Sequence, residues 1–251
     1  TRGAAPVGVL ARRVYQHRCS RLPCNSTRFQ DNLMVAVIKF LLYWIHTFLR
    51  FKSSNYRRKP NRLMATASAD VPLKGLIYLI RAYAELLKEF PDLELVVVGS
   101  LREGPTMQEL EKRGIRDRVQ FISGLDEEDI RKLYAEATIA VSPSVYEGFG
   151  FPAGEALSCG VPLVSTDGGS LPEVVGDAGI IVPHSNPPAL AQAIADLLNN
   201  PDKRDALSVK GRKHILQNFT WSRCAQEVVD MYRATIAKNA NIQLTNADNS
   251  T

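Results

Sequence analysis

The chain has 251 residues, of which 45% are hydrophobic and 23% are charged, which is typical of a soluble globular protein with one large domain or two small ones. Its net charge of +5 is unevenly distributed: residues 1–62 contain 13 Lys and Arg residues and one acid, Asp31, whereas the remainder contains 18 basic and 25 acidic residues. The chain is a basic leader joined to an acidic body, and we expect no nucleic-acid partner for that body.

Four cysteines, Cys19, Cys24, Cys159 and Cys224, are too scattered to indicate a disulfide framework, so we expect a reducing, cytoplasmic compartment. Cys19 and Cys24 lie close to His17, yet their spacing does not match a usual zinc site and no second pair follows. We therefore expect no bound metal ion and no other cofactor.

The basic leader, residues 1–61, does not show alternating strands and helices. Residues 1–32 are rich in Arg and Ser and poor in acids, which indicates a transit-like or disordered segment. Residues 33–51 form an apolar run that is about long enough to span a bilayer, although Lys39 and His46 interrupt it. A membrane-associated helix and a core helix both stay open here, and the basic residues nearby suit peripheral contact with an anionic membrane surface.

From residue 62 to residue 238, short apolar runs alternate with segments of helical periodicity. The runs predict strands near residues 63–69, 93–99, 118–124, 138–144, 161–166 and 178–183. Helices are predicted near residues 76–90, 106–113, 126–137, 152–159, 188–198, 202–217 and 221–237. Because most strands are apolar throughout, we predict a parallel sheet covered on both faces: a doubly wound, Rossmann-like α/β domain, followed by a disordered tail at 239–251.

The Gly-rich stretches of this domain all follow a strand, which places them at the carboxyl edge of the sheet, where ligands bind. The most unusual is EGFGFPAGEALSCG, from Glu147 to Gly160. Gly148 and Gly150 carry no Cβ, so a ligand can approach their backbone N–H groups just before the helix predicted at 152–159. The N-terminus of a helix favours phosphate, because its N–H groups are free and its dipole end is positive.

Two carboxylates lie on either side of this phosphate-binding stretch. Glu155 lies near the first turn of the predicted helix, and its paired oxygens suit a vicinal diol such as the ribose O2′ and O3′. Glu147 lies on the other side, where a second hydroxylated group fits. Taken singly, Glu155 is more often a helix-capping acid, Glu147 a solvated loop acid and Phe149 a core residue. Together they predict a site for a nucleotide sugar.

Two other turns at the same edge carry candidate residues. Lys74 precedes Gly75 at the opening of the helix after the first strand, where an ammonium group can neutralise a diphosphate, although a solvated lysine is equally typical of a first turn. The segment DGGSLPEVVG, residues 167–176, contains a Gly-Gly pair that either approaches the ligand or turns the chain. Glu173 in this segment is interpreted as a helix-start acid rather than as a ligand.

These motifs resemble a known family over residues 62–238. Glu147 and Glu155, with GFGFPAG between them, resemble the E-x7-E signature of the family 4 retaining glycosyltransferases. Other stretches resemble that family in the same order: VPLKGLIYLI, LVVVGS, VQFISGL, GVPLVSTDGGSLPEVV and FTWSRCAQEVVDMYRATI. The resemblance implies the C-terminal, donor-binding half of a GT-B fold, in which two Rossmann-like domains enclose the active site. It also implies transfer of a sugar from a nucleotide diphosphate donor to a hydroxyl acceptor, with retention at the anomeric carbon and without a bound metal.

The resemblance further implies roles for the two catalytic candidates and for the second glutamate. Lys74 binds the diphosphate and stabilises the charge that develops on this leaving group. Glu147 contacts the donor sugar. Glu155 binds the ribose hydroxyls.

Backbone groups complete the implied donor site. Phe149 and Gly150, next to Gly148, offer N–H groups to the sugar or the phosphate, and the base lies near Gly124. The last predicted helix, 221–237, is expected to cross back toward the other domain.

Two features depart from the family pattern. Family members usually carry an arginine a few positions before the lysine, but ATASADVPL, the segment before Lys74, contains none; either Arg62 or another cation replaces it, or the leaving group is less stabilised. An acceptor-binding domain of about 150 residues is expected before residue 62. Because residues 1–61 do not resemble one, we expect that domain to be missing or to be supplied by another chain.

Three functions stay open on the sequence. The first is a glycosyltransferase or its donor half, and the second is a nucleotide-sugar binding module without transfer activity. The third is a GT-B-like sugar-nucleotide epimerase, against which the spacing of Glu147 and Glu155 argues. Donor hydrolysis or transfer separates the first from the second, and epimerised donor identifies the third.

Overall fold

A parallel sheet forms the centre of the structure, a computed structural model that describes residues 57–67, 71–220, 222–223, 225–233 and 236. The strands of these residues are β1 (Arg62–Thr66), β2 (Glu94–Val98), β3 (Val119–Ile122), β4 (Ile139–Ser142), β5 (Leu163–Thr166) and β6 (Ile180–Val182). They follow the order β3-β2-β1-β4-β5-β6, and each neighbouring pair is parallel. The predicted doubly wound α/β class is confirmed.

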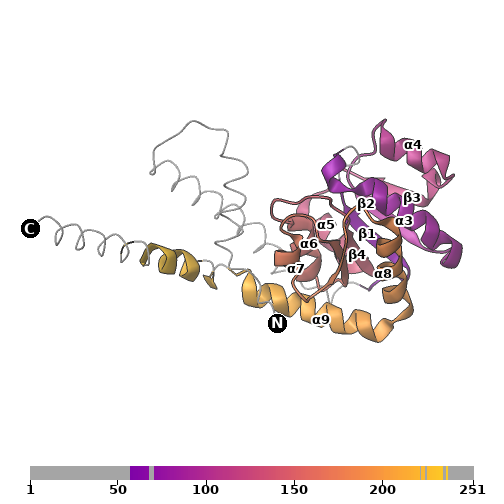
Figure 1. Cartoon of the computed structure of the whole chain (residues 1–251). Coiled ribbons are helices and arrows are strands. Elements are labelled where there is room, and N and C mark those ends of the chain that lie inside the picture. The colour runs from indigo at the N-terminus through magenta and orange to yellow at the C-terminus, as the bar shows by residue number, and fades with distance from the viewer. Residues whose placement is uncertain (1–56, 68–70, 221, 224, 234–235, 237–251) are drawn as a thin grey trace, which may run out of the picture.

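Helices connect the strands and cover both faces of the sheet (Figure 1). The α-helices are α3 (Leu76–Glu89), α4 (Pro105–Lys112), α5 (Glu127–Glu136), α6 (Phe151–Ser158), α7 (Leu171–Val175), α8 (Pro187–Asn199) and α9 (Pro201–Asn218). Among the described residues, the 3-10 turns η2 (Pro72–Lys74) and η3 (Arg116–Arg118) were not predicted, because three residues carry no periodicity. Residues 222–223, 225–233 and 236 are also helical, within the last helix that was predicted.

Alternating side chains of the strands fill two separate apolar cores. In β1, Leu63 and Ala65 belong to the core beneath α3 and α8, whereas Met64 belongs to the core beneath α6 and α9. Strand β4 repeats the alternation, with Ile139 in the first core and Ala140 in the second. Because successive strand residues point to opposite faces, a sheet covered on both sides requires strands that are apolar throughout.

The helix starts follow the local signals in the sequence. The side chain of Asp126 caps α5 by accepting a hydrogen bond from the backbone N–H of Asp129 at 2.9 Å, and Asn186 caps α8 through Ala189 at 3.1 Å. Helix α6 has Pro152 in its first turn, where the missing N–H of proline costs no hydrogen bond.

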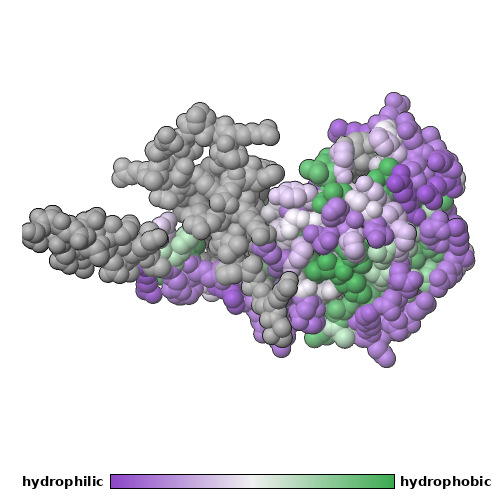
Figure 2. Space-filling view, in the orientation of Figure 1, coloured by the Kyte–Doolittle hydropathy of each residue, from purple (hydrophilic) through white to green (hydrophobic). Residues whose placement is uncertain are grey.

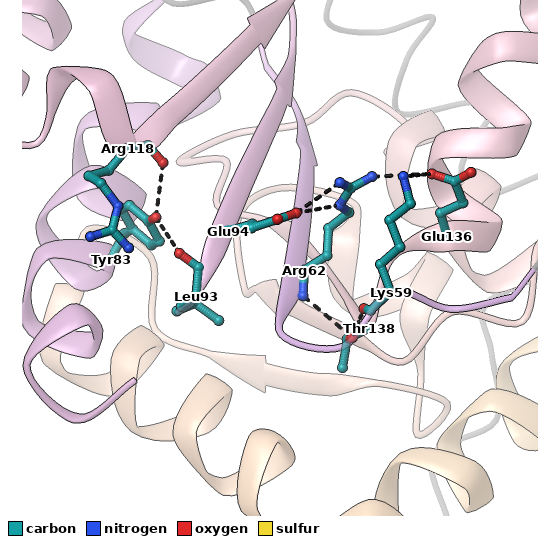
Figure 3. A network of polar contacts seen from close by, with 8 residues as sticks. All are labelled: Lys59, Arg62, Tyr83, Leu93, Glu94, Arg118, Glu136 and Thr138. Atoms are coloured by element: carbon teal, nitrogen blue, oxygen red, sulfur yellow. Dashed lines mark hydrogen bonds and ion pairs between the residues drawn. The ribbon is translucent and has the colours of Figure 1, made fainter. Parts of the chain in front are cut away.

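A polar network lies at the amino edge of the sheet, where β1 and β2 begin (Figure 3). The guanidinium group of Arg62 lies 2.8 Å from Glu94 and 3.2 Å from Glu136, and Lys59 lies 2.9 Å from the same Glu136 carboxylate. Lys74, in contrast, follows β1 and lies at the carboxyl edge. Arg62 therefore lies on the opposite side of the sheet from Lys74. The prediction that Arg62 replaces the missing arginine is wrong.

The chain reaches β1 along the same amino edge. The guanidinium group of Arg58 donates hydrogen bonds to the carbonyl oxygens of Ala137 at 3.0 Å and of Gly160, and to Ser208 Oγ at 3.1 Å. These bonds join the segment before β1 to the ends of α5 and α6 and to α9. On the sequence alone, this segment belongs to the leader, residues 1–61. The boundary between the leader and the domain at residue 62 stays a prediction.

The surface of the domain is largely hydrophilic around α4, and apolar residues gather in the middle of the face shown in Figure 2. Each helix among the described residues is too short or too polar to cross a bilayer. The leader segments 1–32 and 33–51 and the tail 239–251 lie outside the described residues, as does the suggested membrane contact.

Candidate functional site

The strand order changes direction between β1 and β4, which lie side by side in the middle of the sheet. Open α/β sheets bind ligands outside the carboxyl ends of the strands at such a point. Lys74 follows β1 and Glu147 follows β4, and their side chains meet with 2.6 Å between Nζ and Oε1. The two predicted catalytic residues, 73 positions apart in the sequence, thus come together where a ligand is expected.

The turns that carry these residues pack against each other through their backbones. Gly75 has φ +63°, and a Cβ at this position would lie 2.0 Å from the carbonyl oxygen of Pro143. The backbone N–H of Val145 donates to the carbonyl oxygen of Leu73 at 2.9 Å. Such close contact requires glycine, because no other residue fits both the conformation and the space.

The Gly-Gly turn after β5 supports Glu147 through its backbone. Gly169 has φ +65°, and a Cβ there would lie 2.3 Å from the Glu147 carbonyl oxygen. Ser170 donates to the same oxygen from its N–H at 3.0 Å and from its Oγ at 3.1 Å. The turn therefore turns the chain and packs against Glu147, and its approach to a ligand stays a prediction.

The Glu147 carboxylate is buried, with 8% of the residue exposed. Its Oε1 accepts hydrogen bonds from Lys74 Nζ at 2.6 Å and from Ser144 Oγ at 2.8 Å. The interpretation as a solvated loop acid is therefore wrong. Ser144 was not predicted as a site residue, and its signal in the sequence is a hydroxyl at the end of a strand, three residues before the glutamate.

Backbone N–H groups next to Glu147 are available to a ligand. In the part of the chain that the structure describes, the N–H groups of Gly148, Phe149 and Gly150 donate to no protein acceptor. Gly150, with φ +94°, is the N-cap of α6, so these groups lie at the positive end of the helix dipole. The ring of Phe149 packs against Phe151 with 4.8 Å between centroids, so its side chain is a core residue and only its backbone faces the site.

Glu155 lies one turn inside α6 and is 7% exposed. It was predicted near the first turn, but the helix begins at Phe151, so Glu155 is in the second turn and does not cap the helix. Its Oε2 accepts a hydrogen bond from the hydroxyl of Tyr134 at 3.3 Å. Burial raises the pKa of Glu155 to about 7, and the charge of Glu127 raises it as well, whereas the Tyr134 hydrogen bond and Lys74 lower it.

Gly124, near which the resemblance places the base, and Glu173, interpreted as a helix-start acid, both lie near the ends of regular elements. Gly124 follows β3, has φ +74° and is exposed, and a Cβ there would meet no atom within 4 Å. It therefore lies at the carboxyl edge beside open space. Glu173 is in the first turn of α7, as expected of a helix-start acid.

The structure has cavities at both edges of the sheet. One of about 220 Å³ lies beside the Lys74 turn and is lined by apolar residues that include Pro72 and Leu76. Another, of about 700 Å³, lies at the amino edge and is lined by paired charges such as Arg62 and Glu94. In residues 57–236, as far as they are described, no three His, Cys, Asp or Glu side chains gather as metal ligands would.

Comparison with known proteins identifies the family of this chain. The profile of the family described as glycosyl transferases group 1 matches residues 49–214. An MMP alpha-(1->4)-mannosyltransferase of Mycolicibacterium hassiacum is 40% identical over 187 residues, which are 73% of this chain and 45% of that protein. The O-antigen chain mannosyltransferase B of Escherichia coli is 34% identical over 64% of this chain and 43% of its own length. The chain thus spans less than half the length of these relatives.

Solved structures show the same fold. The C-terminal domain of a glycosyl transferase group 1 family protein (LpcC) from Francisella tularensis has a TM-score of 0.58 and 23% identity, over 67% of this chain and 90% of that domain. Anabaena Alr3699/HepE, solved in complex with UDP and glucose, has a TM-score of 0.61 and 22% identity, over 69% of this chain and 48% of that one. The fold is that of the C-terminal half of a GT-B glycosyltransferase, and the chain belongs to the glycosyl transferases group 1 family.

Proposed function

We propose that this chain is the donor-binding half of a glycosyltransferase that transfers a sugar from a nucleoside diphosphate sugar to a hydroxyl acceptor with retention of configuration. The observation that carries the proposal is the contact of Lys74 with Glu147 between β1 and β4, where the strand order changes direction. The N–H groups of residues 148–150, which donate to no acceptor among the described residues, lie beside this contact. A cation, phosphate-binding N–H groups and a second buried carboxylate, Glu155, are the groups that a nucleotide sugar requires.

Each group then has a chemical role. The N–H groups of Phe149 and Gly150 bind phosphate or sugar oxygens, and Glu155 accepts hydrogen bonds from the ribose diol. Lys74 stabilises the negative charge on the departing diphosphate, which is electrostatic catalysis by a preorganised cation. Glu147 accepts hydrogen bonds from the donor sugar, and the base lies near Gly124.

Lys74 has to exchange partners for this reaction. Its Nζ is bonded to Glu147, and the diphosphate competes with that carboxylate for the ammonium group. When the donor sugar is bound, its hydroxyls supply new partners for Glu147. When only the diphosphate remains, the Glu147 carboxylate lies beside it and repels it, which favours product release.

The named relatives support a nucleotide sugar and suggest which one to try first. The relatives from Mycolicibacterium hassiacum and Escherichia coli are mannosyltransferases by name, and the Anabaena structure holds UDP and glucose. A relative from Corynebacterium glutamicum, 29% identical, is named as GDP-mannose-dependent. GDP-mannose is therefore the first donor to test, and the acceptor of this chain follows from none of these names.

Calorimetric titration of the full chain with UDP, GDP and ADP, without added metal, tests the proposal. We expect saturable binding of one nucleotide, weakened about 5- to 150-fold in Glu155→Ala, because hydrogen bonds to a diol contribute about 1–3 kcal/mol. Glu136→Ala, which removes a carboxylate at the amino edge, is the matched control and leaves the affinity unchanged. A folded chain that binds none of the three nucleotides contradicts the proposal.

The products formed from GDP-mannose separate the remaining functions. Mannose transferred to an added alcohol with the α configuration of the donor supports a retaining transferase, and released mannose shows that the bond between the sugar and the diphosphate is cleaved. Donor that stays intact while bound indicates a binding module, and epimerised donor indicates an epimerase.

A further inference from the structure

We propose that Tyr134 is a positioning residue that holds Glu155 in place for the ribose diol, with Thr66 orienting the Tyr134 hydroxyl. This inference rests on the proposed function, since it concerns how Glu155 recognises the nucleotide. It names two residues outside the glycine-rich stretch as determinants of selectivity for ribose.

Three elements bring these groups together. The Tyr134 hydroxyl, on α5, lies 2.9 Å from Thr66 Oγ1 at the end of β1, 3.2 Å from the carbonyl oxygen of Pro152 and 3.3 Å from Glu155 Oε2 on α6. Tyr134 is 1% exposed and Glu155 is 7% exposed. A buried carboxyl group held by one hydrogen bond from a buried ring has few alternative positions.

The hydrogen-bond donors and acceptors of this cluster leave one oxygen of the Glu155 carboxylate for the ligand. The Tyr134 hydroxyl has one proton and faces two acceptors, the Pro152 carbonyl and Glu155 Oε2. Thr66 can donate its own proton to the Tyr134 oxygen, so that the Tyr134 proton points toward Pro152 and Glu155 rather than toward Thr66. The hydrogen bonds of the described residues use Oε2 alone, so Oε1 is left to accept from a ribose hydroxyl.

Burial and the surrounding charges set the pH above which the Glu155 carboxyl group is ionised and acts only as a hydrogen-bond acceptor. Burial and the Glu127 carboxylate raise the pKa of Glu155, whereas the Tyr134 hydrogen bond and the Lys74 ammonium group lower it. Cys159, on the same side of α6, is a neutral thiol because burial raises its pKa. Loss of the Tyr134 hydroxyl removes a bond that stabilises the ionised carboxylate, so the pKa of Glu155 rises further.

The chain contains a matched control for a buried tyrosine hydroxyl. Tyr83 is also fully buried, and its hydroxyl donates to the carbonyl oxygens of Leu93 at 2.7 Å and Arg118 at 3.0 Å (Figure 3). It contacts no candidate site residue through these bonds. Tyr83→Phe therefore reproduces the loss of a buried hydroxyl without touching Glu155.

The test compares a nucleoside diphosphate with its 2′-deoxy form, using whichever of UDP, GDP and ADP binds the full chain most tightly. We expect the unsubstituted protein and Tyr83→Phe to prefer the ribose form about tenfold, and Tyr134→Phe to prefer it about twofold or less. Thr66→Val, which keeps the ring in place, is expected to lie between these values. In addition, the pH at which binding reaches half its maximum rises in Tyr134→Phe and not in Tyr83→Phe.

The outcomes distinguish this inference from the proposed function. Binding with an undiminished ribose preference in Tyr134→Phe and Thr66→Val overturns the inference and leaves the proposed function intact. Absence of any nucleotide binding by the unsubstituted protein overturns both. If Tyr134→Phe does not fold, Thr66→Val decides: a reduced ribose preference supports the inference, and an unchanged preference overturns it.

Discussion

Glu155 shows at the scale of one residue how burying a carboxyl group lowers the stability of the folded protein. Its pKa is raised to about 7, first by desolvation, so in the folded protein the carboxyl group takes up a proton at a pH where the unfolded chain has lost it. The folded state therefore binds more protons than the unfolded state between about pH 4.5 and pH 7. In this window the contribution of Glu155 to the free energy of unfolding falls as pH rises, and it stays low above pH 7.

We predict that Glu155→Gln removes this pH dependence. At pH 8 the variant should be more stable than the unsubstituted protein by up to about 3 kcal/mol, since one pKa unit corresponds to about 1.4 kcal/mol, and at pH 4 the difference should vanish. Urea denaturation of both proteins at several pH values measures this difference in the free energy of unfolding. A difference that is constant from pH 4 to pH 8 would show that Glu155 has an ordinary pKa.

A second prediction concerns the Lys74–Glu147 ion pair. Lys74→Ala should weaken binding of a nucleoside diphosphate about tenfold or more while leaving the nucleoside almost unaffected, because only the diphosphate carries the charge that Lys74 neutralises. Glu147→Gln should tighten diphosphate binding, because the competing carboxylate is removed, and weaken binding of the intact donor. Titrations of nucleoside, diphosphate and donor measure these effects.

The control for that prediction is the nucleoside itself. Equal losses of nucleoside and diphosphate affinity in Lys74→Ala would mean that Lys74 does not bind phosphate. Unchanged diphosphate affinity in Glu147→Gln would mean that the 2.6 Å ion pair does not compete with the ligand.

At the scale of elements, the turn between η2 and α3 depends on one glycine. Gly75→Ala would place a Cβ 2.0 Å from the Pro143 carbonyl oxygen, whereas Gly114→Ala, at a similar φ of +64°, would place it in open space. We predict a loss of about 1–2 kcal/mol for Gly114→Ala from conformation alone and about 3 kcal/mol or more for Gly75→Ala. Nucleotide affinity should fall only in Gly75→Ala, because this turn carries Lys74. Equal losses of stability in both variants would contradict the close packing of the two loops.

At the scale of the whole molecule, the proposed ligand site lies at the carboxyl edge of the sheet, and the segment before β1 is held at the amino edge. Arg58, whose pKa is lowered by burial, joins the chain before β1 to Gly160 and Ser208 at the amino edge. Arg58→Ala should lower the free energy of unfolding by about 2–3 kcal/mol without changing nucleotide affinity. Arg233→Ala, at a side chain that is 74% exposed, is the control and should change neither. Weaker nucleotide binding in Arg58→Ala would show that the two edges are coupled.

Much of the fold was predictable because its signals are local. The apolar runs, the Asp126 cap and the prolines of the first helical turns depend on residues close in sequence, so strands and helices appeared where predicted. The positions of Lys74, Glu147 and Gly124 after strands placed them correctly at the carboxyl edge. Helix α6 begins one residue earlier than predicted, and Glu155, which was predicted near the first turn, lies in the second turn.

Contacts between distant segments were not predictable in the same way. The ion pair of Lys74 with Glu147 spans 73 positions, and the Tyr134 hydrogen bond to Glu155 spans 21. The sequence likewise indicated that the Gly-Gly pair either approaches a ligand or turns the chain. It did not indicate that Gly169 and Ser170 pack against Glu147. Such contacts depend on which strands are neighbours in the sheet, and periodicity within a segment carries no information on strand order.

The sequence by itself determined the α/β class, the alternation of strands and helices and the edge of the sheet at which the candidate residues lie, because each follows from neighbouring residues. Only the tertiary structure decided that Glu147 is buried against Lys74 and Ser144, that Tyr134 is hydrogen-bonded to Glu155, and that Arg62 lies at the opposite edge in a paired network. The physical reason is that burial and charge pairing depend on the order in which the strands assemble, which brings together side chains that the chain itself keeps far apart.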